Sequence, residues 1–286
     1  MTEVMMKLLQ IDAFTDRPFQ GNPAAVCILE APASPGWMQQ VAAEMNLSET
    51  AFVFLENAQT DRYRLQWFTP TTEVDLCGHA TLATAYALWS ESLVSETKTI
   101  VFDTRSGELQ ATLEDRWIRL NFPASLSAPV MQIPAGLTEA LGLSLEPRRI
   151  CSNSLGYLVE VSTEAIVREL EPDFTHLKTF AVPGVIVTSP SDRSFDFISR
   201  FFAPNLGINE DPVTGSAHCC LAPYWYDRQQ ETQAKQETTG EMKSKFLAYQ
   251  ASPRGGVVQM EYLKDSQRVI LAGQAVTILR GELTEY

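Results

Sequence analysis

Residues 68–89 read FTPTTEVDLCGHATLATAYALW and form the most informative segment of this chain. The segment joins a Pro turn, an acidic stretch, a Cys-Gly-His step and a long apolar run of small residues. Residues 202–225, FAPNLGINEDPVTGSAHCCLAPYW, repeat these parts in the same order. Both end in an apolar segment that contains a Tyr and closes with Trp. We call them the first and second motifs, and their recurrence predicts a duplicated half of ordinary domain size.

Composition limits the class of protein. A length of 286 residues suits two domains or one large one, and an apolar fraction of 45% is enough for a hydrophobic core. Charged residues make up 20%, and the formal net charge is −13 without any basic stripe. Because nucleic-acid binding needs clustered Lys and Arg to neutralise phosphates, this balance argues against a nucleic-acid partner.

The chain also lacks the marks of a membrane or secreted protein. No apolar run approaches the ~18 residues that suggest a membrane span. The first ten residues do not have the pattern of a signal peptide. Five Cys form an odd set without framework spacing, which favours reduced thiols. We therefore predict a cytoplasmic protein with no membrane partner.

Many short strands and two strongly apolar helices predict an α+β fold. The helices are expected at residues 78–90 and 215–227, and each is apolar on nearly every face, which indicates burial. Residues 123–134 are rich in Pro and Ser, so we predict halves at 1–123 and 124–286. The last strand, 275–283, can belong to either half. The polar residues 229–243 are predicted to form a loop, and Ser34 followed by Pro35 predicts a helix start.

Gly78 and Gly215 stand at the predicted starts of the two helices. First-turn N–H groups have no intrahelical partners and carry the positive end of the helix dipole, so each start is a candidate anion site. Two such starts facing one another across a cleft would bind a small carboxylate from both sides. The alternative is that each glycine only permits a tight turn from strand to helix.

His79 and Cys77 flank the first of these glycines. His79 is one of only three His, and a histidine here can act as an acid or base because its pKa is easily placed near neutrality. It can equally be a core histidine bonded to a carbonyl. A helix N-terminus lowers the pKa of a thiol such as Cys77. The second motif has Thr214 in its place, so a symmetric pair of thiols is absent.

Two carboxylates complete the set of candidates. Glu49 precedes a buried strand, where it can be a general base with a raised pKa or a solvated turn residue. Asp211 directly precedes the second helix and can cap it or contact a ligand. His218 lies beside Cys219, but no second ligand pair has metal spacing, so we interpret it as structural and predict no metal site. Motifs for pyridoxal phosphate, dinucleotides and nucleoside triphosphates are missing, so no cofactor is predicted.

These residues fall within motifs that resemble the PhzF family of phenazine-biosynthesis-like isomerases. The resemblance spans nearly the whole chain in order and implies the fold of the diaminopimelate epimerases. That fold has two pseudo-symmetric halves, each a curved, barrel-like, mostly antiparallel sheet around a central buried helix, with the site between them. The matching segments are Asp12-Ala13-Phe14-Thr15, Gly21-Asn22-Pro23-Ala24, Asn46-Leu47-Ser48-Glu49-Thr50, Phe68-Thr69-Pro70, Cys77-Gly78-His79-Ala80-Thr81, Thr104-Arg105-Ser106-Gly107 and the eight residues from Glu210 to Ala217.

The resemblance also implies roles for individual residues. It makes Glu49 the acid/base and His79, Asp211 and Ser216 its catalytic companions. Cys77 matches one of the two cysteines that flank the substrate carbon in diaminopimelate epimerases, and Thr214 replaces the other. The residues that we assign to substrate binding are Gly78, Gly215, Asn22, Cys77 and Thr214.

We therefore predict a cofactor-independent isomerase that moves a proton on a small anionic metabolite by general acid/base catalysis. The resemblance makes a homodimer plausible. Two alternatives stay open. The chain can be a non-catalytic small-molecule binder or interaction protein on the same fold. Cys77 can also be a nucleophile, although spacing alone reveals no base for it.

Overall fold

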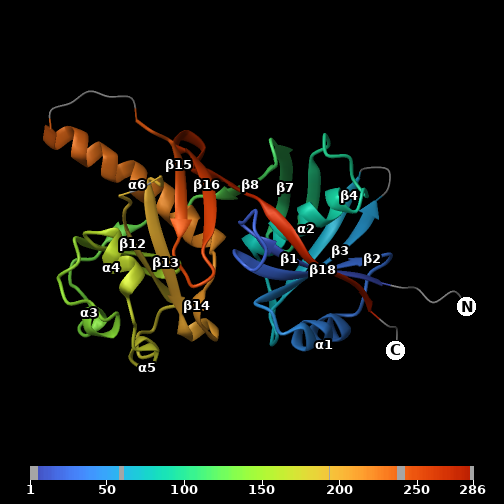
Figure 1. Cartoon of the computed structure of the whole chain (residues 1–286), viewed down its shortest axis with the longest axis horizontal. Helices are drawn as coiled ribbons and strands as arrows, with labels where there is room; N and C mark the ends of the chain where they lie inside the picture. Colours follow the sequence, from blue (N-terminus) through green and yellow to red (C-terminus); the bar gives the residue numbers. More distant parts are fainter. Residues whose placement is uncertain (1–5, 58–60, 193, 237–241, 284–286) are drawn as a thin grey trace, which may run out of the picture. The chain divides into compact units, whose positions relative to one another are not determined.

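The computed structural model describes residues 6–57, 61–192, 194–236 and 242–283 of a sheet-rich α+β chain (Figure 1). The chain divides into two compact units: Met1–Asn121 with Ala272–Tyr286, and Phe122–Leu271. The boundary between the units falls just before the predicted position 123. Of the two alternatives for the last strand, this division favours the one in which it belongs with the first unit.

The first unit is a mixed sheet in which two helices link parallel strands. Helix α1 connects β2 to β3, and α2 lies between β4 and β6; both strand pairs are parallel, as such crossovers require. The pairs β18–β1, β1–β2, β3–β4, β4–β5, β6–β7 and β7–β8 are antiparallel. The elements are β1 (Met6–Ala13), β2 (Asn22–Leu29), α1 (Pro35–Met45), β3 (Glu49–Asn57), β4 (Arg62–Phe68), β5 (Glu73–Val74), α2 (Gly78–Ser90), β6 (Ile100–Thr104), β7 (Gly107–Glu114), β8 (Trp117–Pro123) and β18 (Ala275–Leu283).

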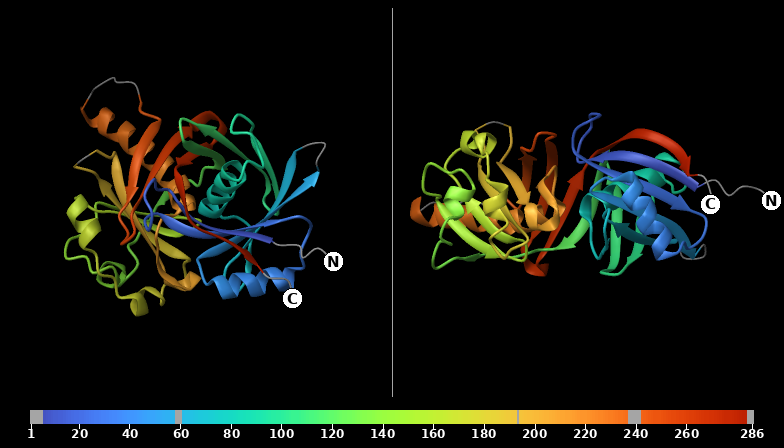
Figure 2. Two further views of the ribbon diagram at one scale, coloured as in Figure 1. Left: turned by 45° about the vertical axis from the view of Figure 1, so that its right-hand side comes forward. Right: turned by 90° about the horizontal axis from the view of Figure 1, so that it is seen from below.

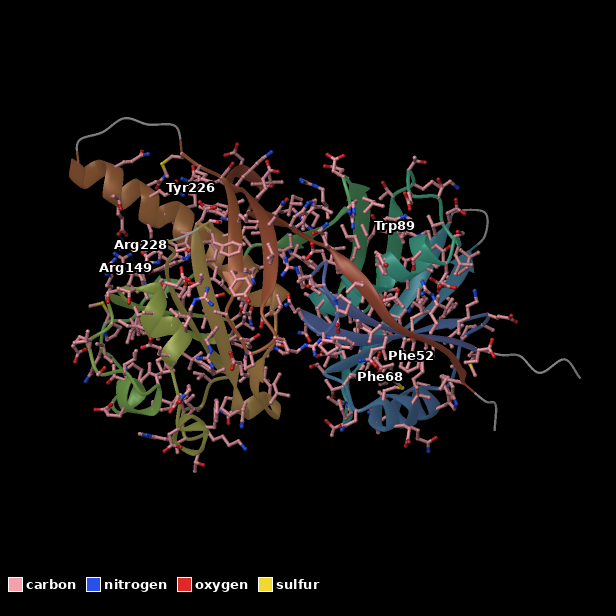
Figure 3. All side chains as sticks on the ribbon, in the orientation of Figure 1. Phe52, Phe68, Trp89, Arg149, Tyr226 and Arg228 are labelled. Atoms are coloured by element: carbon pink, nitrogen blue, oxygen red, sulfur yellow. The ribbon has the colours of Figure 1, made fainter. Side chains whose placement is uncertain are left out.

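Local sequence explains where the helices of this unit begin. Ser34 caps α1 by accepting a hydrogen bond from the Trp37 amide, and Pro35 occupies the first turn, as predicted. Helix α2 begins at Gly78, and nearly all of its residues are buried, in keeping with its apolar composition. It packs on β1, β2, β3 and β18 (Figure 2). Phe52 and Phe68 meet edge to face beside α1 (Figure 3).

The return of the chain to the first unit is fixed by close packing at Gly273. A Cβ atom there would lie 2.4 Å from Phe14 Cδ1 and 2.9 Å from Leu82 Cδ1, so only glycine fits without a shift. Strand β18 then pairs with β1 along its length, from Ala275 opposite Ala13 to Leu283 opposite Met6. The sheet that packs on α2 therefore includes strand β18.

The second unit is also a mixed sheet. Its strands are connected in the order β9–β10–β11–β12–β13–β15–β16, with β14 paired to β13; β11–β12 and β13–β15 are parallel. The elements are β9 (Ala128–Pro129), α3 (Leu137–Ala140), β10 (Arg149–Asn153), β11 (Gly156–Glu160), α4 (Glu164–Glu169), α5 (Phe174–Leu177), β12 (Gly184–Pro190), β13 (Phe197–Ala203), η1 (Pro204–Leu206), β14 (Ile208–Asp211), α6 (Gly215–Gln236), β15 (Lys245–Gln250), β16 (Gly256–Leu263), η2 (Lys264–Ser266) and β17 (Arg268–Gly273), whose end passes into the first unit.

Helix α6 is longer than the predicted helix 215–227. It continues to Gln236, so the predicted loop at 229–243 is wrong in its first part, and residues 237–241 lie outside the described residues. Ion pairs hold its polar half: Arg228 contacts the buried Glu160 at 2.7 Å, and Glu231 forms a two-bonded pair with Arg149 (Figure 3). These long-range partners stabilise a segment whose local sequence lacks an apolar stripe.

Two sequence expectations concern the whole chain. Among the described residues, no helix is long and apolar enough to cross a membrane. All five cysteines are buried and in the thiol form.

Candidate active site

Glu49 and Asn22 begin two neighbouring parallel strands. Glu49 opens β3 and pairs in register with Ala24 of β2, two residues after Asn22. Gly21 makes the turn that leads into β2: its φ is +65°, and a Cβ there would lie 2.1 Å from the Ala13 carbonyl oxygen. The glycine of the Gly-Asn-Pro segment is therefore required by the backbone, and it directs Asn22 into the interior, where that side chain is fully buried.

His79, in the first turn of α2, lies between these strand starts. Its Nε2 atom is 3.2 Å from Glu49 Oε2, and its Nδ1 atom is 3.2 Å from Asn22 Nδ2. The Glu49 contact has ion-pair distance but not full hydrogen-bond geometry. His79 is 5% exposed, whereas the Glu49 side chain is 20% exposed. The carboxylate can therefore reach a substrate, while the imidazole acts from behind it.

Burial sets the charge of His79. Desolvation lowers its pKa to about 3, because the imidazolium loses its hydration in the interior. The nearby Glu49 carboxylate favours the charged form, but burial outweighs it. His79 is therefore a neutral imidazole at physiological pH and not a histidine that titrates near neutrality.

Cys77 is the N-cap residue of α2 and lies on the other side of the same ring. Its Sγ atom is 3.5 Å from His79 Nδ1, a base partner that the spacing alone did not reveal. Donor atoms of Glu49, Cys77 and His79 all lie within 4.8 Å of one another, which is close enough to consider a metal ion. The carboxylate and the thiol, however, approach opposite nitrogens of one imidazole. This arrangement suits proton transfer along a chain better than chelation of a single ion.

The second unit holds Asp211 and Thr214 in a different arrangement. Thr214 Oγ1 donates a hydrogen bond of 2.5 Å to Asp211 Oδ2. Gln250, a fully buried residue of β15, braces both: its Oε1 accepts from the Thr214 amide at 2.8 Å, and its Nε2 donates to the Asp211 carbonyl at 2.7 Å. Gln250 lies outside both sequence motifs. Only its position in a strand with alternating burial could have pointed to it.

Helix α6 follows at once, with Gly215 buried and Ser216 exposed in its first turn. His218 is fully buried, and its Nδ1 donates to the Thr214 carbonyl oxygen at 2.7 Å. Desolvation lowers its pKa to about 4, although the carbonyl contact opposes this shift. His218 therefore bonds to its own helix turn, in agreement with the structural interpretation.

Three of the four acids that precede the two glycines are paired with arginines. Arg105 contacts Glu73 at 2.9 Å and Asp75 at 3.2 Å, and the Asp75 side chain is exposed. In the second motif, Arg200 binds Glu210 through two hydrogen bonds of 2.7 and 2.8 Å in a largely buried pair. We assign these pairs to structure, which leaves Asp211 as the acid with a candidate role.

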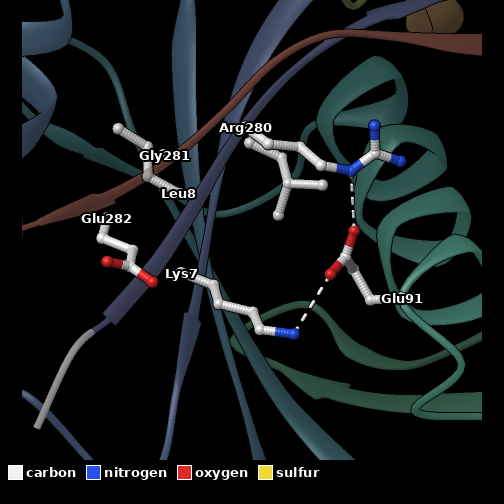
Figure 4. A pocket seen from close by; sticks show the side chains of 7 residues that line it. Lys7, Leu8, Glu91, Arg280, Gly281 and Glu282 are labelled. Carbon is white, nitrogen blue, oxygen red and sulfur yellow. Dashed lines mark hydrogen bonds and ion pairs between the residues drawn. The ribbon is translucent and has the colours of Figure 1, made fainter.

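Two cavities of the first unit lie at the other end of α2. One, of about 330 Å³, is lined in part by Lys7, Glu91 and Arg280, and Glu91 bonds to both basic side chains (Figure 4). The other, of about 710 Å³, includes Tyr86 and Trp89 in its lining. Because these positions belong to the last turns of α2, both cavities are remote from His79 in its first turn.

The predicted site residues thus form two clusters. In the first unit the structure brings together Glu49, His79, Cys77 and Asn22, next to Gly78. In the second unit Asp211 contacts Thr214, which directly precedes Gly215 and Ser216. The first cluster can accept a proton at an accessible carboxylate, and the second presents a buried carboxylate beside a helix start.

Comparison with known proteins agrees with these features. The family model for phenazine biosynthesis-like proteins, PhzC-PhzF, matches residues 11–281. A protein of Halalkalibacterium halodurans named as an uncharacterised isomerase is 48% identical over 274 residues, covering 96% of each chain. The crystal structure of a PhzF family protein from Enterococcus faecalis has a TM-score of 0.87 at 40% identity, covering 99% of this chain and 100% of that one.

The fold is shared more widely. A hydroxyproline epimerase from Agrobacterium vitis has a TM-score of 0.59 at 11% identity, covering 98% of this chain and 92% of that one. At this identity the likeness concerns the fold alone. The family match and the relatives of high identity carry the assignment: this chain belongs to the PhzC-PhzF family of phenazine biosynthesis-like proteins.

Proposed function

We propose that this protein is a cofactor-independent isomerase that moves a proton on a small carboxylate-bearing metabolite, with Glu49 as the acid/base. The observation that carries the proposal is the Glu49 carboxylate, accessible on one side and 3.2 Å from the buried His79 Nε2 on the other. The isomerase names of close relatives support the reaction class. Glu49 takes a proton from carbon next to the substrate carboxylate or to an unsaturated system, and returns it elsewhere on the same molecule.

The helix start supplies the positive field that the acidic chain otherwise lacks. The first-turn N–H groups of α2, at Gly78 and His79, have no partners within the helix and carry the positive end of its dipole. The side chain of the N-cap residue, Cys77, makes no capping hydrogen bond to these N–H groups. These N–H groups can bind the substrate carboxylate or the enolate oxygen that develops when Glu49 removes a proton.

We assign the cluster of the second unit to substrate positioning. The Asp211 carboxylate is held by Thr214, and Ser216 is exposed in the first turn of α6. A braced carboxylate and an exposed hydroxyl beside the N–H groups of Gly215 and Ser216 are suited to bind polar groups of a substrate. We also propose that the two units arose by duplication, each with a curved sheet around its helix, and that the protein acts as a homodimer in the cytoplasm.

The test is hydrogen exchange at carbon. Small carboxylic acids are incubated with the protein in heavy water, and deuterium uptake is read by mass. Glu49→Gln is expected to slow uptake by about 10²–10⁴-fold, the usual contribution of a general acid or base. Glu56→Gln is the matched control, because Glu56 is an exposed carboxylate on the same strand β3. Full exchange by Glu49→Gln would remove Glu49 from the mechanism.

A second candidate function is thiol chemistry at Cys77, favoured by its 3.5 Å contact with His79 Nδ1. In that case, alkylation of Cys77 by iodoacetamide and the change Cys77→Ser would each abolish activity, while Glu49→Gln would have a smaller effect. A non-catalytic binder would instead retain a ligand without exchange and would be indifferent to Glu49→Gln. The same set of variants therefore separates all three functions.

A further inference from the structure

Asn22 contacts the imidazole of His79, which its predicted role in substrate binding does not explain. Its side chain is fully buried at the start of β2. Its Nδ2 atom lies 3.2 Å from His79 Nδ1, a contact between residues 57 positions apart in the sequence. The turn at Gly21 directs it inward. An interior amide that faces an imidazole nitrogen is placed to control that ring.

The groups around the imidazole differ on its two sides. At Nδ1 the neighbours are the Asn22 amide at 3.2 Å and the Cys77 thiol at 3.5 Å, and both can donate a hydrogen. At Nε2 the neighbour is the Glu49 carboxylate at 3.2 Å. An ionised carboxylate can accept a hydrogen bond but cannot donate one. A neutral imidazole has one N–H and one lone pair. The surroundings therefore favour a lone pair at Nδ1 and the proton at Nε2.

We propose that Asn22 is a positioning residue that fixes His79 in its Nε2–H tautomer, so that the imidazole directs its N–H toward the Glu49 carboxylate. The kinetic part of this inference rests on the proposed function, whereas the tautomer itself does not. Asn22 touches no reacting atom in this scheme. It acts through His79, just as the partners of functional histidines commonly set ring orientation and tautomer.

This arrangement has a chemical purpose for the base. A neutral N–H donor orients the carboxylate while adding no full positive charge, and a full charge would make Glu49 a weaker base. The other tautomer would turn a lone pair toward the carboxylate, and the two would repel. When Glu49 receives a proton from substrate carbon, its carboxyl group loses its negative charge and its attraction to the nearby Nε2–H weakens, which favours return of that proton to the substrate.

The first experiment measures the tautomer without activity. The protein has three His, so the ring nitrogens of His79 can be assigned in long-range ¹H–¹⁵N NMR spectra by single substitutions of His176 and His218. In the wild type at neutral pH we expect the Nε2–H form of His79. Asn22→Asp places an acceptor against Nδ1 in nearly the same shape, and we expect it to change the spectrum to the Nδ1–H form or the imidazolium.

Thr50→Val is the matched control, because Thr50 is fully buried next to Glu49 and the change preserves its shape. This variant is expected to keep the wild-type tautomer. A wild-type His79 in the Nδ1–H or imidazolium form would overturn the proposal, as would an Asn22→Asp spectrum identical to that of the wild type. The wild-type measurement decides the question even if an Asn22 variant fails to fold.

The second experiment measures turnover. Asn22→Leu, which removes the donor, is expected to lower kcat for deuterium exchange by about 10–100-fold, the range typical of partners that orient a functional histidine. KM is expected to stay within about threefold, because a residue that acts on the base stabilises the transition state rather than binding substrate. A rise in KM at unchanged kcat would return Asn22 to substrate binding. If Glu49→Gln keeps full exchange, the proposed function fails while the tautomer result stands.

Discussion

In the first motif Glu73 pairs with Arg105, and in the second Glu210 pairs with Arg200. Each helix then begins at a glycine, and the carbonyl oxygen just before that glycine accepts a side-chain hydrogen bond from one turn later. Those donors are Thr81 Oγ1 in the first motif and His218 Nδ1 in the second. The helix starts are therefore built alike. The shared sequence pattern sets the backbone of each helix start, and side chains of different types brace it.

The chemistry beside the two helix starts differs. The first has a neutral imidazole between a carboxylate and an amide, whereas the second has a carboxylate bound to Thr214 and braced by Gln250. The differing neighbours come from other strands: β2 and β3 in the first unit, β15 in the second. One motif thus supports two kinds of site, and strands remote in sequence decide which kind is made.

The largest effect on stability is expected where the two helices differ most. Helix α2 is held by apolar packing, whereas the polar half of α6 is held by Arg228 and the buried Glu160. Glu160→Gln should lower the free energy of unfolding by about 3–5 kcal/mol, because it removes the buried carboxylate that accepts from both Arg228 and Tyr224 and leaves Arg228 with Glu231 alone among the described residues. Urea unfolding measures this.

A surface pair provides the control for that change. Lys98 contacts Asp61 at 2.7 Å, but both side chains are about 60% exposed. Lys98→Ala should lower the free energy of unfolding far less than Glu160→Gln, since exposed pairs are screened by water and salt. Equal losses in the two variants would mean that the buried network does not anchor α6.

The next effect concerns pH, because the second motif has a buried histidine where the first has a threonine. Burial lowers the pKa of His218 from about 6.5 to about 4, so the folded protein binds fewer protons than the unfolded chain between these values. The contribution of neutral, buried His218 to the free energy of unfolding is present above about pH 6.5 and is lost as the pH falls toward 4. The loss is about 3 kcal/mol at most, because each unit of pKa difference corresponds to about 1.36 kcal/mol.

His218→Thr copies the first motif and removes this titration. The variant should be less stable at pH 7, where a cavity replaces the ring, but its stability should fall less steeply between pH 6.5 and 4 than that of the wild type. Urea unfolding at a series of pH values gives the two slopes. Parallel curves would contradict a contribution from His218. The wild-type slope also contains His79, whose pKa burial lowers to about 3.

The smallest effect compares two threonine hydroxyls. Thr214→Val removes a donor to a carboxylate, and Thr81→Val removes a donor to a backbone carbonyl. Hydrogen bonds to charged groups contribute about 1.5–3 kcal/mol, and those between neutral groups about 0.5–1.5 kcal/mol. Thermal or urea unfolding should therefore show the greater loss for Thr214→Val. The reverse order would contradict a charge-assisted hydrogen bond between Thr214 and Asp211.

The sequence was a good guide to local structure. Ser34 and Pro35 predicted the start of α1, and the apolar run after Gly78 predicted the buried α2, because capping and burial patterns depend on near neighbours in the chain. The same reasoning predicted too early an end for α6. Its polar half is stabilised by Glu160 of β11 and Arg149 of β10, and the local sequence of the helix does not reveal these partners.

The candidate site divides in the same way. The sequence, with the family resemblance, singled out Glu49, His79 and Cys77, because their residue types and motif positions suit proton transfer. It could not show that His79 would be neutral, since its pKa depends on burial by the surrounding fold. Nor could it show that Asn22 faces that ring.

By itself, then, the sequence determined the two helix starts, which follow from short-range patterns of glycine and apolar residues. Through the family resemblance of its motifs it also indicated the family and the candidate proton carriers. The tertiary structure alone decided the protonation state of His79, the pairing of Asn22 with it, and the bracing of Asp211 through Gln250. Those properties depend on desolvation and on contacts between strands and helices far apart in the chain, and they exist only once the chain has folded.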